Sequence, residues 1–235
     1  MRPPRRASSG KSLLLPLALI SLFSGPILSP AADTNALLSG WLDSQKNIQT
    51  WSADFVQTRR LKSFTEPLTA TGQVWFAAPN QFRWELGHPP QTIALRQPDQ
   101  MLVIYPRLKR VEKYPLTGAA AGQWKDTMAL LEAGFPRDRA ELESRFKVSA
   151  MTVSNDVCEV TLLPASSQAR KMIPQMKIGF GTKDFFLLGT ELEFADGSTM
   201  RNDFQNPKVN EPSGEDRFQP KLDPAFKLVE PMKGK

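Results

Sequence analysis

The sequence predicts an α+β fold: a curled antiparallel β-sheet, an unclosed half-barrel of about ten strands, with a few α-helices covering its concave face. Apolar residues alternate with polar ones in many short segments separated by turns, which is typical of strands. Helical spacing occurs only before the first strand and in the middle of the chain. A sheet this long twists and curls. Two helices are too few to coat both faces, so we expect a slot between helices and sheet.

The first 31 residues are expected to be a signal peptide, which leaves residues 32–235 as a single domain. A basic head precedes an apolar run from Leu13 to Leu28, and small residues favour cleavage after Ala31. The alternative is an uncleaved anchor, but a spanning helix needs about 20 uninterrupted apolar residues and this run is broken. No cysteine for lipidation lies at the cleavage site. We therefore expect a soluble periplasmic protein.

The charge of the mature chain excludes one class of partner. The leader holds four basic and no acidic residues, so the remainder has 26 basic against 24 acidic residues, a net charge of +2. Nucleic-acid binding requires a dense basic stripe. The nearest approach, residues 107–113, is interrupted by Glu112. We therefore expect no nucleic-acid partner. Separately, we expect the protein to be a monomer.

The first half of the chain begins with a helix. Asp33 or Thr34 can cap a helix that ends at about Ile48, with Trp41 and Leu42 on its apolar side. The pattern then changes from helical spacing to alternation. The predicted strands cover residues 52–58, 72–78, 81–86, 92–95, 101–105 and 110–114.

The second half begins with a helical insertion. Residues 122–133 have Trp124 and Met128 on one side, and Asp138 to Phe146 extends the helical region beyond a break at Gly134 and Pro136. Asp196-Gly197 is expected to join the last two strands in a tight turn. The predicted strands here cover residues 146–151, 157–163, 176–180, 187–194 and 198–204.

The hairpin at residues 72–86 is the most informative segment. Its two strands are joined by a short Pro-Asn turn, and large apolar residues occupy one face of the second strand while Arg83 and Glu85 occupy the other. The apolar rows consist of Val74, Phe76 and Ala78 in the first strand and Phe82, Trp84 and Leu86 in the second. Such a face needs cover, either from a packed core or from an apolar ligand. On pattern alone, ordinary core is the better explanation.

Residues suited to catalysis are sparse, so we expect no enzyme, cofactor or metal site. The only histidine, His88, lies in a Gly-His-Pro-Pro turn, where a solvated surface group is the usual outcome. One histidine and one cysteine cannot form a zinc site. Cys158 has no disulfide partner and is expected to be a buried small residue. The carboxylate pairs Glu141/Glu143 and Glu191/Glu193 are expected to lie on solvent-exposed faces of their elements.

Several segments resemble the periplasmic outer-membrane lipoprotein carrier family, LolA. They are Ser-Ala-Asp-Phe-Val-Gln at 52–57, Gly-Gln-Val-Trp-Phe at 72–76, Pro-Asn-Gln-Phe-Arg-Trp at 79–84, Tyr-Pro at 105–106 and Leu-Pro at 163–164. The order of elements also matches over about residues 37–226. The resemblance implies an unclosed barrel with a helical lid and a cavity for acyl chains. It implies that the cavity is lined by Phe82, Trp84, Leu86, Val74, Phe76, Ile93 and Leu95, with Trp41, Leu42, Trp124 and Met128 on the lid.

One position departs from the family pattern. Well-studied members carry an arginine immediately before the Pro-Asn turn, which holds the lid shut by hydrogen bonds to the helices, and this chain has Ala78 there. We call that missing group the latch arginine. The resemblance thus implies that the cavity is retained without the latch, as in a divergent paralogue.

The resemblance implies a soluble carrier of lipoprotein or other acylated lipid, which takes cargo from an inner-membrane donor complex and delivers it to an outer-membrane acceptor. The alternative is a periplasmic module that senses lipid and signals to a protein partner. A hydrolase of lipid esters is disfavoured because the sequence offers no nucleophile and base pair.

Overall fold

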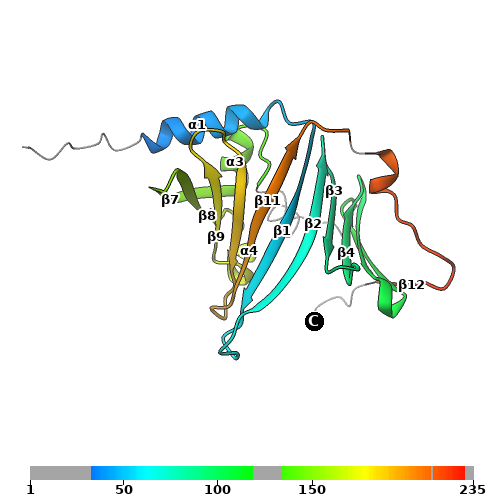
Figure 1. Ribbon diagram of the computed structural model, residues 1–235. Coiled ribbons are helices and arrows are strands. Elements are labelled where there is room, and N and C mark those ends of the chain that lie inside the picture. Colours follow the sequence, from blue (N-terminus) through cyan, green and yellow to red (C-terminus); the bar gives the residue numbers. More distant parts are fainter. Residues whose placement is uncertain (1–32, 119–133, 213, 231–235) are drawn as a thin grey trace, which may run out of the picture. The chain divides into compact units, whose positions relative to one another are not determined.

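The computed structural model describes residues 33–118, 134–212 and 214–230, and the strands of these ranges form one sheet of twelve (Figure 1). Its order is β12-β6-β5-β4-β3-β2-β1-β11-β10-β9-β8-β7. The first six strands are β1 (Thr50–Arg60), β2 (Leu68–Ala77), β3 (Gln81–Leu86), β4 (Thr92–Arg96), β5 (Gln100–Tyr105) and β6 (Arg110–Pro115). The others are β7 (Phe146–Ser154), β8 (Val157–Pro164), β9 (Gln175–Gly181), β10 (Leu187–Glu193), β11 (Thr199–Val209) and β12 (Lys227–Val229).

The predicted fold class is confirmed: an unclosed, curled sheet accompanied by a few helices. The described strands exceed the expected ten, and all but one of their neighbouring pairs are antiparallel. The exception is β12, which pairs with β6 in parallel and lay in no predicted segment. Three residues are too few to show an alternating pattern, so only the pairing with β6 defines this strand.

The described α-helices are α1 (Thr34–Gln45), α3 (Arg139–Arg145) and α4 (Ser167–Met172). Short 3-10 turns, η1 (Pro106–Leu108) and η3 (Glu215–Phe218), follow β5 and β11. Asp33 caps α1 as predicted, because its carboxylate accepts hydrogen bonds from the backbone N–H groups of Asn35 and Ala36. The helix ends at Gln45 rather than near Ile48, and α4 was not predicted. The predicted helix at residues 122–133, with Trp124 and Met128, lies outside the described residues.

The helix α1 lies across one end of the sheet and buries its apolar side against the inner face (Figure 1). The indole of Trp41 stacks on the ring of Phe180 in β9, with centroids 5.0 Å apart. Leu38 and Leu42 are buried beside it. Burying such a side chain contributes about 1.5–3 kcal/mol, so packing on the sheet, and not helix propensity, holds α1 in place.

The main apolar cluster lies on this inner face. Along β1, buried and half-buried residues alternate, and the buried row is Trp51, Ala53, Phe55 and Gln57. The same cluster contains Val74 and Phe82, with further apolar side chains of β7 to β11. One continuous inner face therefore extends from the β2–β3 hairpin to the far edge of the sheet.

A second apolar cluster lies on the outer face, and it corrects one prediction. Leu95 is fully buried in this cluster, and Ile93 packs against it, rather than beside Phe82 and Trp84. Leu95 pairs across the strands with Arg83, and residues directly opposite share a face. The expectation that both residues belong to the inner row was wrong because both faces of β4 are covered, so apolarity there does not identify the inner side.

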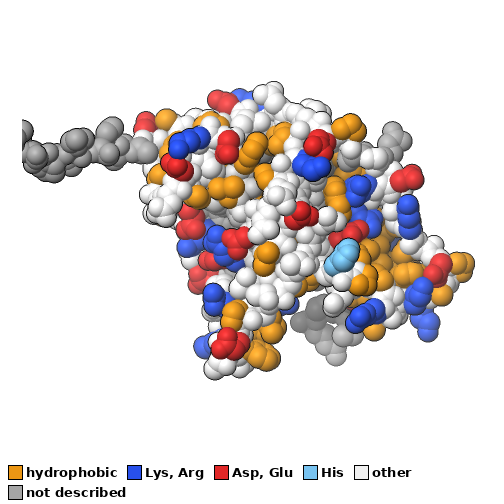
Figure 2. Space-filling view, viewed as in Figure 1, with side chains coloured by type: hydrophobic (Ala, Val, Ile, Leu, Met, Phe, Trp, Pro, Cys, Tyr) orange, Lys and Arg blue, Asp and Glu red, His pale blue; other side chains and the backbone are white. Residues whose placement is uncertain are grey.

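The other isolated residues lie where they were expected. Cys158 is fully buried, and burial raises the pKa of its thiol. His88 is exposed in a turn. In the described part of the chain, none of the helices combines the length and apolarity needed to cross a bilayer. Basic and acidic side chains are interspersed on the face shown in Figure 2.

Candidate functional site: an apolar cavity and its mouth

The β2–β3 hairpin brings its two apolar rows together on the inner face. Val74 pairs with Trp84 and Phe76 pairs with Phe82, so the predicted rows are directly opposite each other. The strand β1 packs closely against this hairpin. A Cβ at Gly72 would lie 2.2 Å from both the Glu85 carbonyl oxygen and the Phe55 ring, so this position requires glycine.

Aromatic rings form the floor of the inner face. The rings of Phe55 and Trp84 lie 4.0 Å apart between centroids, and Phe82 stacks on Trp84 at 6.0 Å. Phe204 of β11 meets Trp84 edge-on at 6.2 Å and Trp51 edge-on at 5.2 Å. Offset and edge-on pairs of this kind each contribute about 0.5–1.5 kcal/mol beyond the area that they bury. The floor is therefore rigid and almost wholly apolar.

A cavity of about 140 Å³ lies above this floor. Its described walls come mainly from β1, β3, β10, β11 and the segment before α3, with single residues from β2, β4, β5 and β9. Its lining residues are Trp51, Gln57, Val74, Phe82, Trp84, Ala94, Met101, Gly134, Phe135, Met176, Leu187, Thr190, Leu192, Met200, Asn202 and Phe204. We call it the interior cavity.

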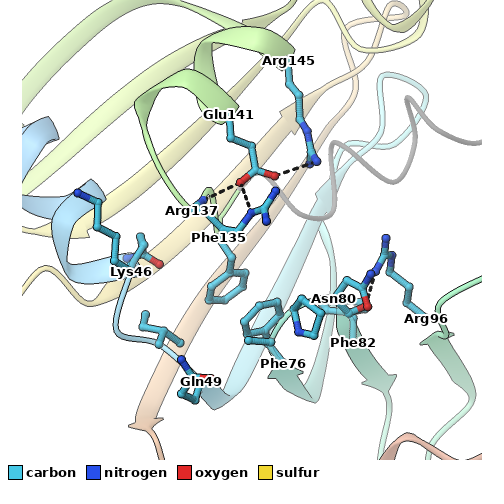
Figure 3. A pocket seen from close by; sticks show the side chains of 14 residues that line it. Lys46, Gln49, Phe76, Asn80, Phe82, Arg96, Phe135, Arg137, Glu141 and Arg145 are labelled. Carbon is cyan, nitrogen blue, oxygen red and sulfur yellow. Dashed lines mark hydrogen bonds and ion pairs between the residues drawn. The ribbon is translucent and has the colours of Figure 1, made fainter.

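A second pocket of about 280 Å³ opens where α1 ends, between α3 and the turn of the β2–β3 hairpin (Figure 3). We call it the mouth. Its walls include Ile48, Phe76, Ala78 and Pro79, while a rim of charged groups surrounds them. Phe82 and Phe135 line both the mouth and the interior cavity, so the two spaces adjoin.

Phe135 separates the mouth from the interior cavity. Its ring stacks on Phe76 with centroids 4.6 Å apart (Figure 3). It also meets the ring of Trp51 edge-on at 5.0 Å. The sequence analysis did not single out this residue. The available signal was an isolated aromatic between two helix breakers, Gly134 and Pro136, in an otherwise irregular segment.

The rim of the mouth is held by ion pairs from α3. The Glu141 carboxylate pairs with the Arg137 guanidinium at 3.1 Å and with the Arg145 guanidinium at 2.9 Å (Figure 3). Glu141 also accepts a hydrogen bond from the backbone N–H of Arg137. The expectation that Glu141 belongs to a solvated face was wrong, since its side chain is only 17% exposed. Across the mouth, Arg96 donates to the carbonyl oxygen of Asn80.

Ala78 lines the mouth, opposite this charged rim. Its backbone N–H donates to the carbonyl oxygen of Gln49 at 2.8 Å, which ties the hairpin to the segment after α1. Its methyl side chain offers no hydrogen bond to α1 or α3. The position that was compared with the latch arginine therefore faces the space between sheet and helices.

A chain of polar side chains interrupts the apolar lining of the interior cavity. Gln57 donates from Nε2 to Oδ1 of Asn202 at 3.0 Å, and Asn202 donates from Nδ2 to Oγ1 of Thr190 at 3.2 Å. Gln57 and Asn202 are only 7% and 6% exposed. We call these three residues the polar triad. The sequence analysis did not single out Gln57; alternation puts it on the face of Phe55, but its hydrogen-bond partners lie on strands distant in the sequence.

The residues predicted to contact ligand fall into three groups. Val74, Phe76, Phe82 and Trp84 line one or both cavities, while Leu86 packs in the same inner cluster. Trp41 and Leu42 are buried on the side of α1 that packs against the sheet. The remaining predicted residues are Ile93 and Leu95, which lie on the outer face, and Trp124 and Met128, which are outside the described residues.

The described walls of the interior cavity are mostly apolar, with three hydrogen-bonded polar side chains among them. Among the described residues, no cluster of three or more histidine, cysteine, aspartate or glutamate side chains is arranged to hold a metal ion. Among the described residues of the cavity's lining, none has a side chain that titrates near neutral pH. The polar triad is neutral and hydrogen-bonded. Pockets with apolar walls and a few placed polar groups are typical of small-molecule and lipid sites.

Solved structures with a similar fold share little sequence with this chain. A DUF1329 family protein from Desulfovibrio piger is 11% identical, with 79% of this chain and 97% of that chain covered and a TM-score of 0.47. An uncharacterized conserved protein from Thermus thermophilus is 10% identical, with 84% of this chain and 98% of that chain covered and a TM-score of 0.48. A putative outer membrane lipoprotein-sorting protein domain from Vibrio parahaemolyticus is 12% identical, with 79% of this chain and 92% of that chain covered and a TM-score of 0.40.

The family assignment rests on sequence and not on these structures. No curated protein sequence matches the chain. A family model described as outer membrane lipoprotein carrier protein LolA matches residues 46–221, from the segment before β1 to beyond η3. This range covers most of the chain and includes the hairpin, the floors of both cavities and the polar triad. The protein therefore belongs to the LolA family.

Proposed function

We propose that this protein is a soluble periplasmic carrier, which binds acyl chains of a lipoprotein or related lipid and transfers them towards the outer membrane. The observation that supports this most is the aromatic inner face, on which Phe82 and Trp84 line a cavity instead of a closed core. Membership of the LolA family and the leader-like first 31 residues agree with it.

The energetics of an exposed acyl chain explain why a carrier needs such a face. Each methylene kept from water is worth about 0.8 kcal/mol, so an exposed chain of about 16 carbons costs on the order of 12 kcal/mol. A carrier has to offset most of this cost and still release its cargo. Two states, closed when loaded and open when empty or delivering, satisfy both requirements.

The cavities as they stand hold less than a whole acyl chain. The interior cavity, at about 140 Å³, has the size of one that accommodates benzene. Loading therefore requires the interior cavity and the mouth to join, and Phe135 is the side chain between them. Displacing Phe135 from Phe76 and Trp51 would widen the boundary that the two spaces share.

The transfer steps would involve membrane partners. The sequence contains no nucleotide-binding motif, so an inner-membrane donor complex would supply the energy for loading, and an outer-membrane acceptor would receive the cargo. Delivery of a bound probe from the purified protein to acceptor vesicles tests the carrier function. Tight binding without any delivery, together with capture of a protein partner, would instead favour a lipid sensor.

Two tryptophans on opposite faces of one hairpin provide a matched test of the cavity. Trp84→Glu puts a carboxylate on the aromatic floor and should abolish uptake of a fluorescent fatty-acyl probe, while circular dichroism stays close to that of the parent. The control is Trp75→Glu, since Trp75 lies on the outer face beneath the Arg217 guanidinium, 4.4 Å from its ring centre, where a carboxylate can form an ion pair. Equal uptake by both variants would overturn the proposed cavity.

The cellular location has its own test. The mature protein should begin at Ala32 and fractionate with soluble periplasmic proteins. Recovery of the protein mainly from membranes, with residues 1–31 still attached, would contradict a soluble carrier without affecting the cavity.

A further inference from the structure

The polar triad is an unusual feature in a cavity otherwise suited to hydrocarbon. Among the described residues that line the interior cavity, only Gln57, Thr190 and Asn202 carry polar side chains. They lie on three neighbouring strands in direct register, because Asn202 of β11 is opposite Gln57 of β1 and Thr190 of β10. Burial of an amide in apolar surroundings costs free energy unless each polar atom has a partner.

The hydrogen bonds within the triad leave capacity unused. A carboxamide offers two N–H donors and an acceptor oxygen, and a threonine hydroxyl both donates and accepts. The two bonds of the triad use one N–H of Gln57, one N–H of Asn202, the Asn202 oxygen and the Thr190 oxygen as acceptor. Gln57 Oε1 has no hydrogen-bond partner among the described residues, although the side chain is nine-tenths buried and lines the cavity.

The triad lies far from the mouth. Gln49 lines the mouth, directly before β1 begins, and Trp51 is the first inner-face residue of that strand. Gln57 is six residues further along β1, which corresponds to about 20 Å of strand. The acyl chains of one bilayer leaflet span about 15 Å, half of the hydrocarbon core. Of a chain whose head stays at the mouth, therefore, only the distal end can approach the triad.

We propose that the polar triad binds a neutral hydroxyl group carried on the distal part of the apolar ligand, so that the preferred cargo is a hydroxylated acyl chain. This inference rests on the proposed function, since it assumes that the cavity holds a chain. A hydroxyl both donates and accepts, so it matches the free Gln57 oxygen and the remaining N–H and O–H donors of the triad. A plain alkyl chain would leave those groups buried and unpaired.

The test compares hexadecanoic acid, its ω-hydroxy derivative and its α-hydroxy derivative by direct titration of the purified mature protein. The parent should bind the ω-hydroxy acid at least as tightly as hexadecanoic acid, although the hydroxyl makes that chain more soluble in water. The α-hydroxy acid, with its hydroxyl beside the carboxylate, should gain nothing. A preference for the α-hydroxy acid would overturn the proposal, because it would place the head group at the triad.

Variants of the triad supply the second arm. In the double variant Gln57→Met/Asn202→Leu, the ω-hydroxy acid should bind at least about fivefold more weakly than hexadecanoic acid, since its hydroxyl would be buried without a partner. Replacing both amides by apolar groups of similar shape keeps the cavity filled and the fold intact. The single variant Gln57→Met should shift the affinity ratio in the same direction by a smaller factor, and it serves if the double variant folds poorly.

The matched control is Gln73→Met on the outer face, where Gln73 donates to the Asp54 carboxylate instead of lining the cavity. It should keep the affinity ratio of the parent. A parent that prefers hexadecanoic acid, or triad variants with the parent's ratio, would overturn the proposal while the carrier function stands. Failure of the parent to bind any of the three acids would overturn the proposed function as well.

Discussion

The two faces of the β2–β3 hairpin are both rich in apolar residues, yet they are covered in different ways. On the outer face, Leu95 is fully buried in a cluster that includes Phe218 of η3, a residue of the chain's own C-terminal region. On the inner face, Phe82 and Trp84 border the interior cavity. The outer face is thus closed by the protein's own side chains, whereas the inner face keeps apolar surface beside a cavity, which is where the proposed carrier function places the ligand.

The cover of the outer face is held by polar contacts as well as by packing. The Arg83 guanidinium donates to the carbonyl oxygen of Arg217 at 3.0 Å and pairs with the Glu85 carboxylate at 2.6 Å. The Arg217 guanidinium in turn lies over the ring of Trp75. Arg83 and Glu85 were predicted to lie on the other face of the strand from Phe82 and Trp84. On that outer face they hold η3 in place instead of facing open solvent.

The largest expected effect separates stability from binding. Leu95→Ala should lower the free energy of unfolding by about 2–5 kcal/mol, because it leaves a hole in the outer cluster. The affinity of the folded variant for an acyl probe should match the parent. Urea denaturation and probe titration measure the two quantities. A loss of affinity in the folded variant would show that the two faces are coupled.

The next effect concerns the missing latch. Ala78→Arg should place a guanidinium in the mouth, where it can reach Glu141 or the end of α1, and a charged hydrogen bond contributes about 1.5–3 kcal/mol. Amide exchange in α1, and in residues 124–131, should then slow by about 10- to 150-fold, and uptake or release of cargo should weaken. Hydrogen exchange with mass detection measures this. Ala78→Leu is the control, and equal exchange in both variants would refute the latch argument.

A smaller effect is expected at the boundary between the two cavities. Phe135→Ala removes two aromatic contacts, with Phe76 and Trp51, and should cost about 1–3 kcal/mol of stability. The same contacts have to break before a chain can pass, so uptake of a long acyl probe should become roughly 5- to 150-fold faster. Stopped-flow fluorescence measures the rate. Unchanged uptake would mean that chains do not pass Phe135.

The smallest effect belongs to the outer face and depends on pH. Hydrogen bonds from the side chains of Gln73 and Asn206 lower the pKa of Asp54. Because the pKa is lower in the folded chain, this contribution to stability is complete above about pH 4 and is lost as the pH falls through the folded-state value. Asp54→Asn should therefore reduce stability slightly near neutral pH and leave it unchanged at about pH 2. Probe affinity should be the same as in the parent at neutral pH.

The local predictions from sequence succeeded where neighbouring residues decide the outcome. Alternation within one strand set the faces of Phe82, Trp84 and Arg83, and a short turn fixed their pairing with Val74 and Phe76. The family resemblance is confirmed by the match over residues 46–221. The assignment of Ile93 and Leu95 to the inner face failed, because a longer connection precedes β4 and both of its faces are covered.

The sequence by itself determined the strands other than β12, the capped start of the first helix, the apolar rows of the hairpin and the family, since each depends on residues close together in the chain. The tertiary structure alone decided which apolar row borders a cavity, because the residues that contact each face, Phe218 outside and Phe135 inside, lie far from the hairpin in the sequence. It also assembled the polar triad from β1, β10 and β11, and it placed Phe135 between mouth and interior. Register between distant strands is set by packing of the whole sheet, and no local pattern encodes it.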